Sequence, residues 1–261
     1  MLSAHTFRKL RILLLLCVLA AVLLNTWLSK VRIQSWQRPV WVVLYPINAD
    51  ERRDTQLYVN ALDEAHFEDV ERFMQREAMR YDPSLSAVIE LHLAVPVRSH
   101  PPKIPAEANV FQSIVWSLRM RWWAFQNDSW DGPEPDVKIY LRYFSPQNRQ
   151  VLEHSLGLQK GMIGVVNGFA SVDYNAKNSF VITHELMHTL GASDKYDLRS
   201  NEPLFPHGYA EPDKQPLLPQ RYAEVMGGRV KVSPGWTLMP LSLEDVLVGP
   251  ETAREIGWLS R

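Results

Sequence analysis

Two histidines and a glutamate lie close together in the segment His184-Glu185-Leu186-Met187-His188. Side chains four residues apart lie on the same face of an α-helix, about one turn from each other. If this segment is helical, both imidazole rings can therefore bind one metal ion, and Glu185 lies beside the first of them. A carboxylate in that place can take a proton from a water molecule at the metal. The His-Glu-x-x-His pattern is accordingly typical of zinc-dependent hydrolysis.

A third ligand is expected just after this helix. Gly191 allows the helix to end and the chain to turn back, and Asp194 follows six residues after His188. This spacing makes Asp194 the preferred third ligand. A more distant glutamate completes other zinc sites, so further acidic residues remain as alternatives. These alternatives are Asp197, Glu211 and Glu224.

The segment from His184 to Asp194 has the pattern His-Glu-x-x-His-x-x-Gly-x-x-Asp. This pattern resembles the extended motif of the metzincin family of zinc proteases, in its aspartate-ended, snapalysin-like form. The resemblance implies one catalytic Zn²⁺ ion held by His184, His188 and Asp194. It also implies that Glu185 acts as the general base.

Metzincins also have a methionine turn beneath the metal site, and the segment around Met226 resembles such a turn. The resemblance implies that Met226 packs under the ligands without binding the metal. In some metzincins a tyrosine after this methionine stabilises the oxyanion, whereas Tyr222 precedes Met226. The electrophilic residue therefore stays unassigned, and structural roles are expected for the nearby candidates. These candidates are Tyr196, Tyr209 and Tyr222. His207 lies in a predicted loop and is expected to be a surface or cleft histidine, with a role as metal ligand as the alternative.

The surrounding elements must position these residues. Short runs rich in β-branched and aromatic residues predict strands at 40–45, 86–95, 136–144 and 161–166. Helices are expected over 55–80, 107–126 and 178–190 and near 251–256. Proline and glycine make residues 192–240 irregular. The pattern predicts one α+β (mixed α/β) domain over residues 39–261. The resemblance to metzincins implies that this domain is zincin-like, with a twisted mixed sheet, an active-site helix and an irregular C-terminal part.

The helix expected over 107–126 carries a stripe of large apolar residues. They recur at alternating steps of four and three residues, which places them on one helical face. The stripe consists of Phe111, Val115, Leu118, Trp122 and Phe125. An apolar stripe of this kind usually packs against the core, and we expect that here.

Residues 12–28 form a nearly unbroken apolar run between basic segments. A membrane-spanning helix needs about 20 such residues, so we expect a single-pass signal anchor at 12–28. Residues 1–11 would then be a basic N-terminal segment and 29–38 a juxtamembrane linker, with Trp36 at the lipid interface. The catalytic domain would lie outside the cytoplasm. A cleaved signal peptide is the alternative, although no obvious small-x-small cleavage site follows the run.

Composition limits the other possibilities. The formal net charge of the 261-residue chain is -1, so no overall positive field attracts nucleic acid and no such partner is expected. The one cysteine, Cys17, lies inside the apolar run. A metal in the rest of the chain must therefore be held by His, Asp or Glu.

Together these features predict a zinc-dependent metalloendopeptidase acting on a peptide or protein substrate. The glycine-containing segment 161–171 is the expected sheet edge, beside which an extended peptide would bind by strand addition. Two alternatives use the same residues: a zinc amidase acting on cell-wall peptides, and a non-catalytic, membrane-anchored binding module. Non-catalytic relatives usually lose the catalytic glutamate, so the presence of Glu185 favours an enzyme.

Overall fold

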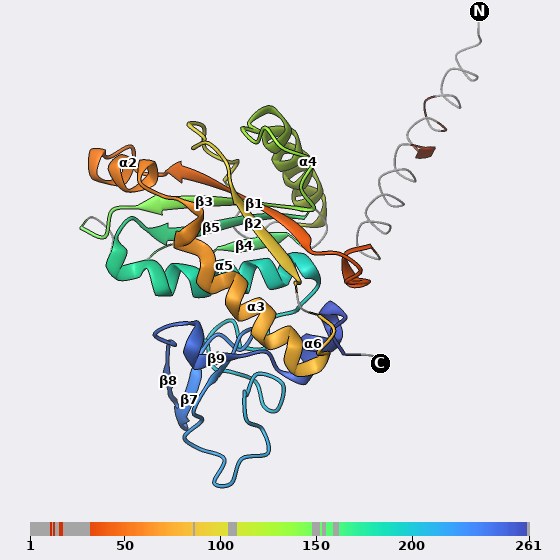
Figure 1. Cartoon of the computed structure of the whole chain (residues 1–261), viewed down its shortest axis with the longest axis vertical. Coiled ribbons are helices and arrows are strands. Elements are labelled where there is room, and N and C mark those ends of the chain that lie inside the picture. Colours follow the sequence, from red (N-terminus) through yellow and green to blue (C-terminus); the bar gives the residue numbers. More distant parts are fainter. Residues whose placement is uncertain are drawn as a thin grey trace, which may run out of the picture.

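The computed structural model describes residues 11, 13, 16, 17, 32–85, 87–103, 109–147, 152, 155–158 and 162–259. It has a mixed α/β fold built on a five-stranded sheet with the strand order β2-β1-β3-β5-β4 (Figure 1). The strands are β1 (Val40–Asn48), β2 (Ile89–Leu93), β3 (Val137–Phe144), β4 (Leu156–Leu158) and β5 (Ile163–Phe169). The first, second, third and fifth strands run parallel, and β4 is antiparallel to β5. The predicted mixed sheet is therefore confirmed.

One prediction about the sheet is only partly right. The segment 161–171 contains β5, which pairs with β3 over Ile163–Phe169, whereas β4 pairs with it on the other side only over 163–165. The edge strand is β4, only three residues long. Its shortness and its single glycine left no alternating pattern that could mark it as a strand in the sequence.

The helices pack on both faces of this sheet. The helix expected over 55–80 is divided, because Asp63 caps a new 3₁₀ turn at Glu64–Phe67 that leads into the second helix. The α-helices are α2 (Arg53–Asn60), α3 (Glu68–Tyr81), α4 (Val110–Gln126), α5 (Asn175–Leu190) and α6 (Pro250–Ile256). The helix that carries the histidines thus begins three residues earlier than predicted and ends at the predicted residue.

Two hydrophobic cores lie on opposite faces of the sheet. Val42 and Leu44 of β1 pack in one core with α3, α5 and the C-terminal region. Val43 and Tyr45 pack in the other core with α4. Because successive side chains of a strand point to opposite faces, α4 and α5 cover opposite sides of the sheet, as Figure 1 also shows.

The prediction that the apolar stripe of α4 faces the core is wrong. The helix packs on the sheet through a different row of residues, Trp116, Met120 and Ala124. The predicted stripe is on the outside of the helix instead. Its exposed fractions are 73% for Phe111, 38% for Val115, 59% for Leu118, 62% for Trp122 and 75% for Phe125. Both faces of α4 are apolar, so periodicity predicted the helix correctly without showing which face the sheet covers.

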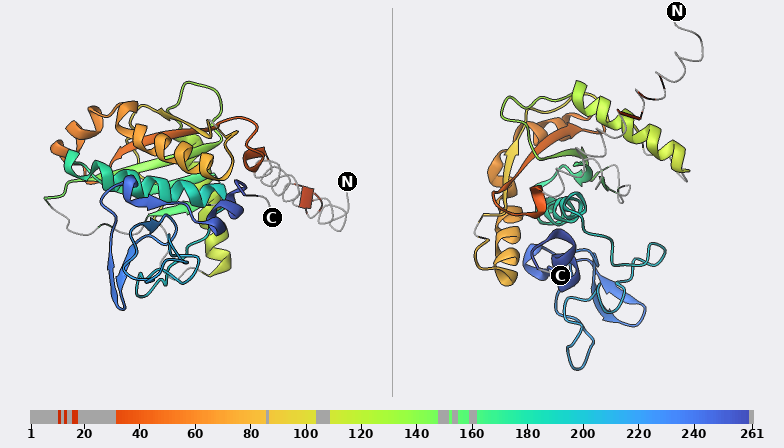
Figure 2. Two further views of the ribbon diagram at one scale, coloured as in Figure 1. Left: turned by 60° about the horizontal axis from the view of Figure 1, so that its bottom comes forward. Right: turned by 90° about the vertical axis from the view of Figure 1, so that its right-hand side faces the viewer.

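The region after α5 lies on the side of that helix away from the sheet (Figure 2). It is largely irregular, as predicted for 192–240, but it also contains short strands. These are β6 (Ala223–Glu224), β7 (Val230–Ser233), β8 (Trp236–Leu238) and β9 (Val246–Leu247). Strand β6 pairs with β9, and β7 pairs with β8. The expected C-terminal helix is α6, which is stopped by Gly257 in a left-handed conformation.

The residues just before the sheet pack on α6. Trp36 is only 9% exposed, and its ring nitrogen donates a hydrogen bond to the carbonyl of Ile256 at 2.9 Å. Its predicted place at a lipid interface is therefore wrong. The side-chain amide of Gln34 donates to the carbonyl of Glu255 at 2.8 Å. The end of the predicted linker is thus attached to the domain.

Within the described part of the chain, no helix combines the length and the apolar character needed to cross a membrane. The predicted anchor at 12–28 lies almost entirely outside the described residues.

Candidate metal centre

Three of the predicted ligands converge on one point. The Nε2 atom of His184 lies 3.2 Å from Oδ1 of Asp194, and Nε2 of His188 lies 3.1 Å from the same oxygen. Among the described residues, these three form the one group of His, Cys, Asp and Glu side chains whose potential ligand atoms all lie close enough for a shared metal, within 4.8 Å of one another. The structure therefore brings together His184, His188 and Asp194 as a site that can hold a metal ion.

The other nitrogen of each imidazole is held by a backbone carbonyl. Nδ1 of His184 is 2.9 Å from the carbonyl oxygen of Val225, and Nδ1 of His188 is 2.9 Å from that of Ala192. A carbonyl can only accept a hydrogen bond, so each Nδ1 carries the proton. Each Nε2 faces Asp194 and is the ring nitrogen that remains to bind a metal, which is how metal-binding histidines are usually oriented.

The separations in the cluster are compatible with a tetrahedral metal site. Zinc–nitrogen bonds of about 2.0–2.1 Å in a tetrahedron separate neighbouring ligand atoms by about 3.3 Å. The observed separations of 3.1 and 3.2 Å from the Asp194 oxygen are close to that value. Two neutral imidazoles and one carboxylate also form a donor set that zinc accepts in catalytic sites, which keep a fourth position open.

The pKa values of His188 and Asp194 are shifted because these side chains are partly buried and lie close together. Burial lowers the pKa of His188, but the Asp194 carboxylate more than offsets this effect and raises the pKa above its ordinary value. Burial alone would raise the pKa of Asp194, whereas hydrogen bonds from His184 and His188 hold it well below its usual range. Asp194 is therefore ionised under ordinary conditions, as a ligand must be.

A sharp turn after α5 places Asp194 close to the two histidines. Gly191 has a φ of 121°, a value that side chains rarely allow. The backbone N–H groups of Gly191 and Ala192 both donate to the carbonyl of Met187, which closes the helix. Three residues later, the N–H of Lys195 donates to the carbonyl of Met226 at 2.9 Å. The chain between these two points carries Asp194 back over the histidines.

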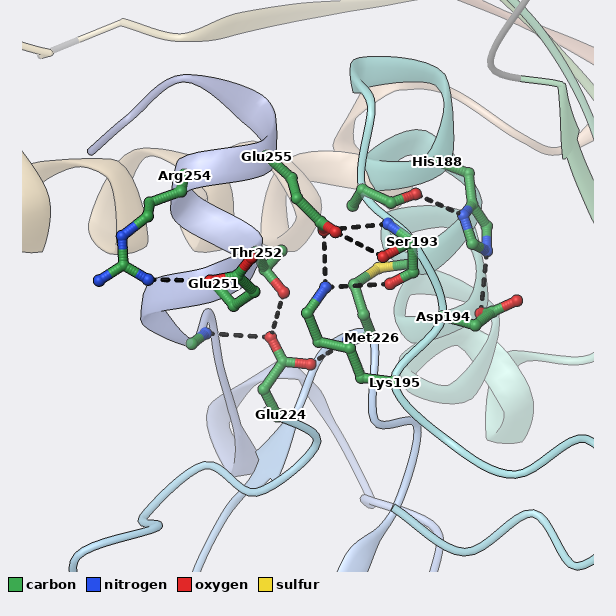
Figure 3. Close-up of polar contacts among 12 residues, drawn as sticks. His188, Ser193, Asp194, Lys195, Glu224, Met226, Glu251, Thr252, Arg254 and Glu255 are labelled. Atoms are coloured by element: carbon green, nitrogen blue, oxygen red, sulfur yellow. Dashed lines mark hydrogen bonds and ion pairs between the residues drawn. The ribbon is translucent and has the colours of Figure 1, made fainter. Parts of the chain in front are cut away.

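Side chains on both sides of Asp194 are held by α6 (Figure 3). Nζ of Lys195 lies 2.6 Å from Oε2 of Glu255, and the backbone N–H of Ser193 donates to the same oxygen at 3.0 Å. The Ser193 hydroxyl donates to the other carboxylate oxygen. Burial opposes ionisation of Glu255, but Lys195 and Ser193 more than offset it, so its pKa is lowered.

The turn around Met226 is fixed by a buried carboxylate. Glu224 is fully buried, and its two oxygens accept from the N–H groups of Met226 at 2.7 Å and Gly227 at 2.8 Å. They also accept from the N–H of Gly249 at 3.0 Å and the hydroxyl of Thr252 at 2.7 Å (Figure 3). Burial raises the pKa of Glu224, yet each of these four neighbours is a donor, as an ionised carboxylate needs. Glu224 is therefore committed to the turn and is not a metal ligand.

The remaining alternatives also lie outside the cluster. Asp197 accepts from the backbone N–H groups of Arg199 and Ser200, both at 2.9 Å, in a tight turn. Glu211 accepts from the N–H of Arg221 at 2.7 Å, and His207 is exposed in its loop. Asp194 is thus the acidic residue that the fold places at the histidines.

A cavity of about 670 Å³ opens beside the cluster. His184, Glu185 and Tyr196 contribute to its lining, together with Asn167 of β5 and Arg229 after the methionine turn. The Tyr196 ring centroid is 6.1 Å from that of His184. Burial, followed by the negative charges of Asp194 and Glu185, raises the pKa of Tyr196 to about 12. Tyr196 therefore keeps its proton and can donate it in a hydrogen bond.

Comparison with known proteins adds no assignment, because no protein-family model matches this chain and no curated protein matches it.

Sequence reasoning missed the residues that support the ligands. Lys195 and Glu255 are 60 positions apart, and Glu224 and Thr252 are 28 positions apart. No local spacing connects such pairs. One usable signal was Lys195 itself, since a lysine directly after a metal-binding aspartate in a buried turn needs an acidic partner.

Proposed function

We propose that this chain is a zinc-dependent metalloendopeptidase of the metzincin type. One observation carries the proposal: the Nε2 atoms of His184 and His188, on the helix that also carries Glu185, converge on a carboxylate oxygen of Asp194 in the turn that follows it. The Gly191 turn and the Met226 turn support it, because both hold the ligand segments through backbone hydrogen bonds.

The chemistry follows from the residues around the cavity. A bound zinc ion supplies a Lewis acid that polarises the scissile carbonyl and acidifies water. Glu185 lines the same cavity as His184 and takes the proton from the attacking water, then delivers it to the leaving amine nitrogen. Tyr196 donates a hydrogen bond to the carbonyl oxygen as negative charge develops there.

A peptide segment suits this cavity. Its volume of about 670 Å³ is within the range of about 300–1,000 Å³ usual for ligand sites. The lining includes Asn167 and Phe169 of β5 and Ser155 just before β4, so the cavity lies beside the sheet edge. An extended substrate would pair with that edge and present one peptide bond to Glu185.

The N-terminal run at 12–28 is proposed to anchor the protein in a membrane as a single-pass segment, with the catalytic domain on the extracytoplasmic side. The uncharged length of the run and its basic flanks support this proposal. The proposed anchor is independent of the metal chemistry and has its own test, which is flotation of the full chain with lipid vesicles.

The zinc site is tested by metal content and peptide cleavage with matched variants of the full chain. We expect about one zinc per wild-type chain and cleavage of a mixed peptide library. Glu185→Gln should keep the zinc and lose cleavage. Asp194→Asn should lose zinc affinity by about 10- to 100-fold or more, whereas Asp197→Asn, a matched change three residues away, should bind zinc normally.

The outcomes separate the alternatives. Zinc without peptide cleavage in any variant would favour an amidase of cell-wall peptides or a binding module. Equal zinc binding by Asp194→Asn and the wild type would show that the third ligand is another residue. A wild-type chain that binds no zinc contradicts the proposed function altogether.

A further inference from the structure

The face of α4 opposite the sheet is strongly apolar. It presents Phe111, Ile114, Val115, Leu118, Trp122 and Phe125, which we call the α4 apolar face. Four of these residues are 59% to 75% exposed, and the rings of Trp122 and Phe125 stack with centroids 5.9 Å apart. A continuous apolar row of this kind marks a binding surface rather than ordinary scatter of apolar residues.

The charges on α4 indicate what covers this face. The helix contains Arg119 and Arg121 and no aspartate or glutamate. Arg98 and Lys103, in the connection before it, are both exposed. Beyond the helix, Asp128 and Glu134 both pair with Lys138, at 2.6 and 3.2 Å, and Asp131 is exposed, so basic residues still outnumber acidic ones in this part of the surface. Large apolar and aromatic residues beside arginines are typical of a helix that lies in the interface of an anionic lipid bilayer.

The place where the chain enters the domain also supports a membrane as the partner of this face. The apolar run ends at Leu28, four residues before Arg32, so its end lies within about 14 Å of Arg32 even when fully extended. Arg32 forms an ion pair of 3.1 Å with Asp136, which lies on the connection from α4 to β3. The chain therefore enters the domain at the end of the sheet where α4 is joined to β3.

We propose that the α4 apolar face inserts into the headgroup region of the same membrane that holds the N-terminal run. The proposal rests on the anchor and not on the zinc chemistry. Because α4 and α5 cover opposite faces of the sheet, insertion of α4 turns the metal centre away from the lipid. The enzyme would then act on substrates that arrive from the aqueous side.

A spin label on the α4 apolar face tests this arrangement in the full chain. In a Cys17→Ser background, Leu118→Cys is labelled and compared with Leu57→Cys on α2, whose parent residues are 59% and 62% exposed. The protein is incorporated into phosphatidylcholine vesicles with and without phosphatidylglycerol. With the anionic lipid, the label at 118 should have a high collision rate with oxygen. Its collision rate with a water-soluble nickel complex should be several-fold lower than that of the label at 57. The label at 57 should show the reverse.

Three results would overturn the proposal. Equal access of the nickel complex to both labels, in protein that floats with the vesicles, would place α4 in water and leave the anchor intact. Failure of the protein to float would remove both the anchor and the α4 interface. A label at 118 that is shielded from both reagents, in detergent as well as in lipid, would show that a protein, such as a second copy of this chain, covers the face. Unchanged zinc content and circular dichroism check that the labelled variants are folded.

Discussion

Lys195 and Glu255 form an ion pair of 2.6 Å that joins the turn carrying Asp194 to helix α6. The lysine side chain is only 5% exposed, and its neighbour Ser193 binds the same carboxylate. Asp194, the proposed third ligand, therefore lies between two residues that both bind the Glu255 side chain. Its position depends on a helix that contributes no ligand itself.

Removal of the Glu255 carboxylate should weaken metal binding. In Glu255→Gln the Lys195 ammonium loses its charged partner, and the turn around Asp194 becomes less ordered. We expect about tenfold weaker zinc binding, at the lower end of what loss of a supporting contact usually costs. Competition with a fluorescent chelator measures the zinc affinity. Glu251→Gln is the matched control, because Glu251 pairs with Arg254 on the same helix and, within the described part of the chain, forms no hydrogen bond or ion pair with the turn. Equal affinities in the two variants would refute the supporting role.

The same pair predicts acid sensitivity of the metal-free protein. The pKa of Glu255 is lowered from its ordinary value of 4.5, so its stabilising effect is present above that value and is lost as the pH falls through the lower, folded-state pKa. The melting temperature of the wild type should therefore fall below about pH 4.5 more steeply than that of Glu255→Gln. Thermal unfolding in a chelator between pH 7 and pH 3 tests this, and parallel curves would contradict it.

Glu224 should be required for stability rather than for catalysis. Four donors surround its buried carboxylate, and the amide group in Glu224→Gln would place a donor against some of them. We expect a loss of about 2–3 kcal/mol in the free energy of unfolding. Urea unfolding measures the change, with Glu211→Gln as a control on a more exposed carboxylate that accepts one backbone N–H. A difference below the error of the measurement would contradict the assignment.

Tyr196 should affect turnover more than substrate binding. Loss of its hydroxyl in Tyr196→Phe removes a donor to the developing oxyanion, so we expect kcat to fall by about 100-fold with a small change in KM. Tyr222→Phe is the control, since Tyr222 does not line the cavity. Steady-state kinetics on a peptide found in the library screen test the prediction. A rise in KM at constant kcat would instead assign Tyr196 to substrate binding.

The ligand cluster was predictable because its information is local. His184, His188, Gly191 and Asp194 lie within eleven residues, and helix geometry followed by a glycine turn almost determines their relative positions. The site's supports were not predictable in this way. The bond from His184 to the Val225 carbonyl spans 41 positions, and only the folded chain brings these groups together.

The sheet shows the same division. The four parallel strands were expected from their composition, whereas the three-residue β4 was not.

In α4, Trp116 and Met120 belong to the core and Leu118 and Trp122 do not. All four are large and apolar, so hydrophobicity alone could not decide between the two faces. Which face of α4 is buried depends on which row of side chains fits against Tyr45 and Tyr140 of the sheet.

The contact between Gln34 and α6 determines how a proteolytic cut just before the sheet would affect the domain. Gln34 binds the backbone carbonyl of Glu255, and Trp36 binds that of Ile256. A cut before Arg32 would free the domain with these contacts in place. A cut after Trp36 would remove them and loosen the helix that holds the Asp194 turn. Proteolysis at two sites only a few residues apart would therefore give, on one side, a domain that keeps these contacts with α6 and, on the other, a domain in which the Asp194 turn has lost part of its support.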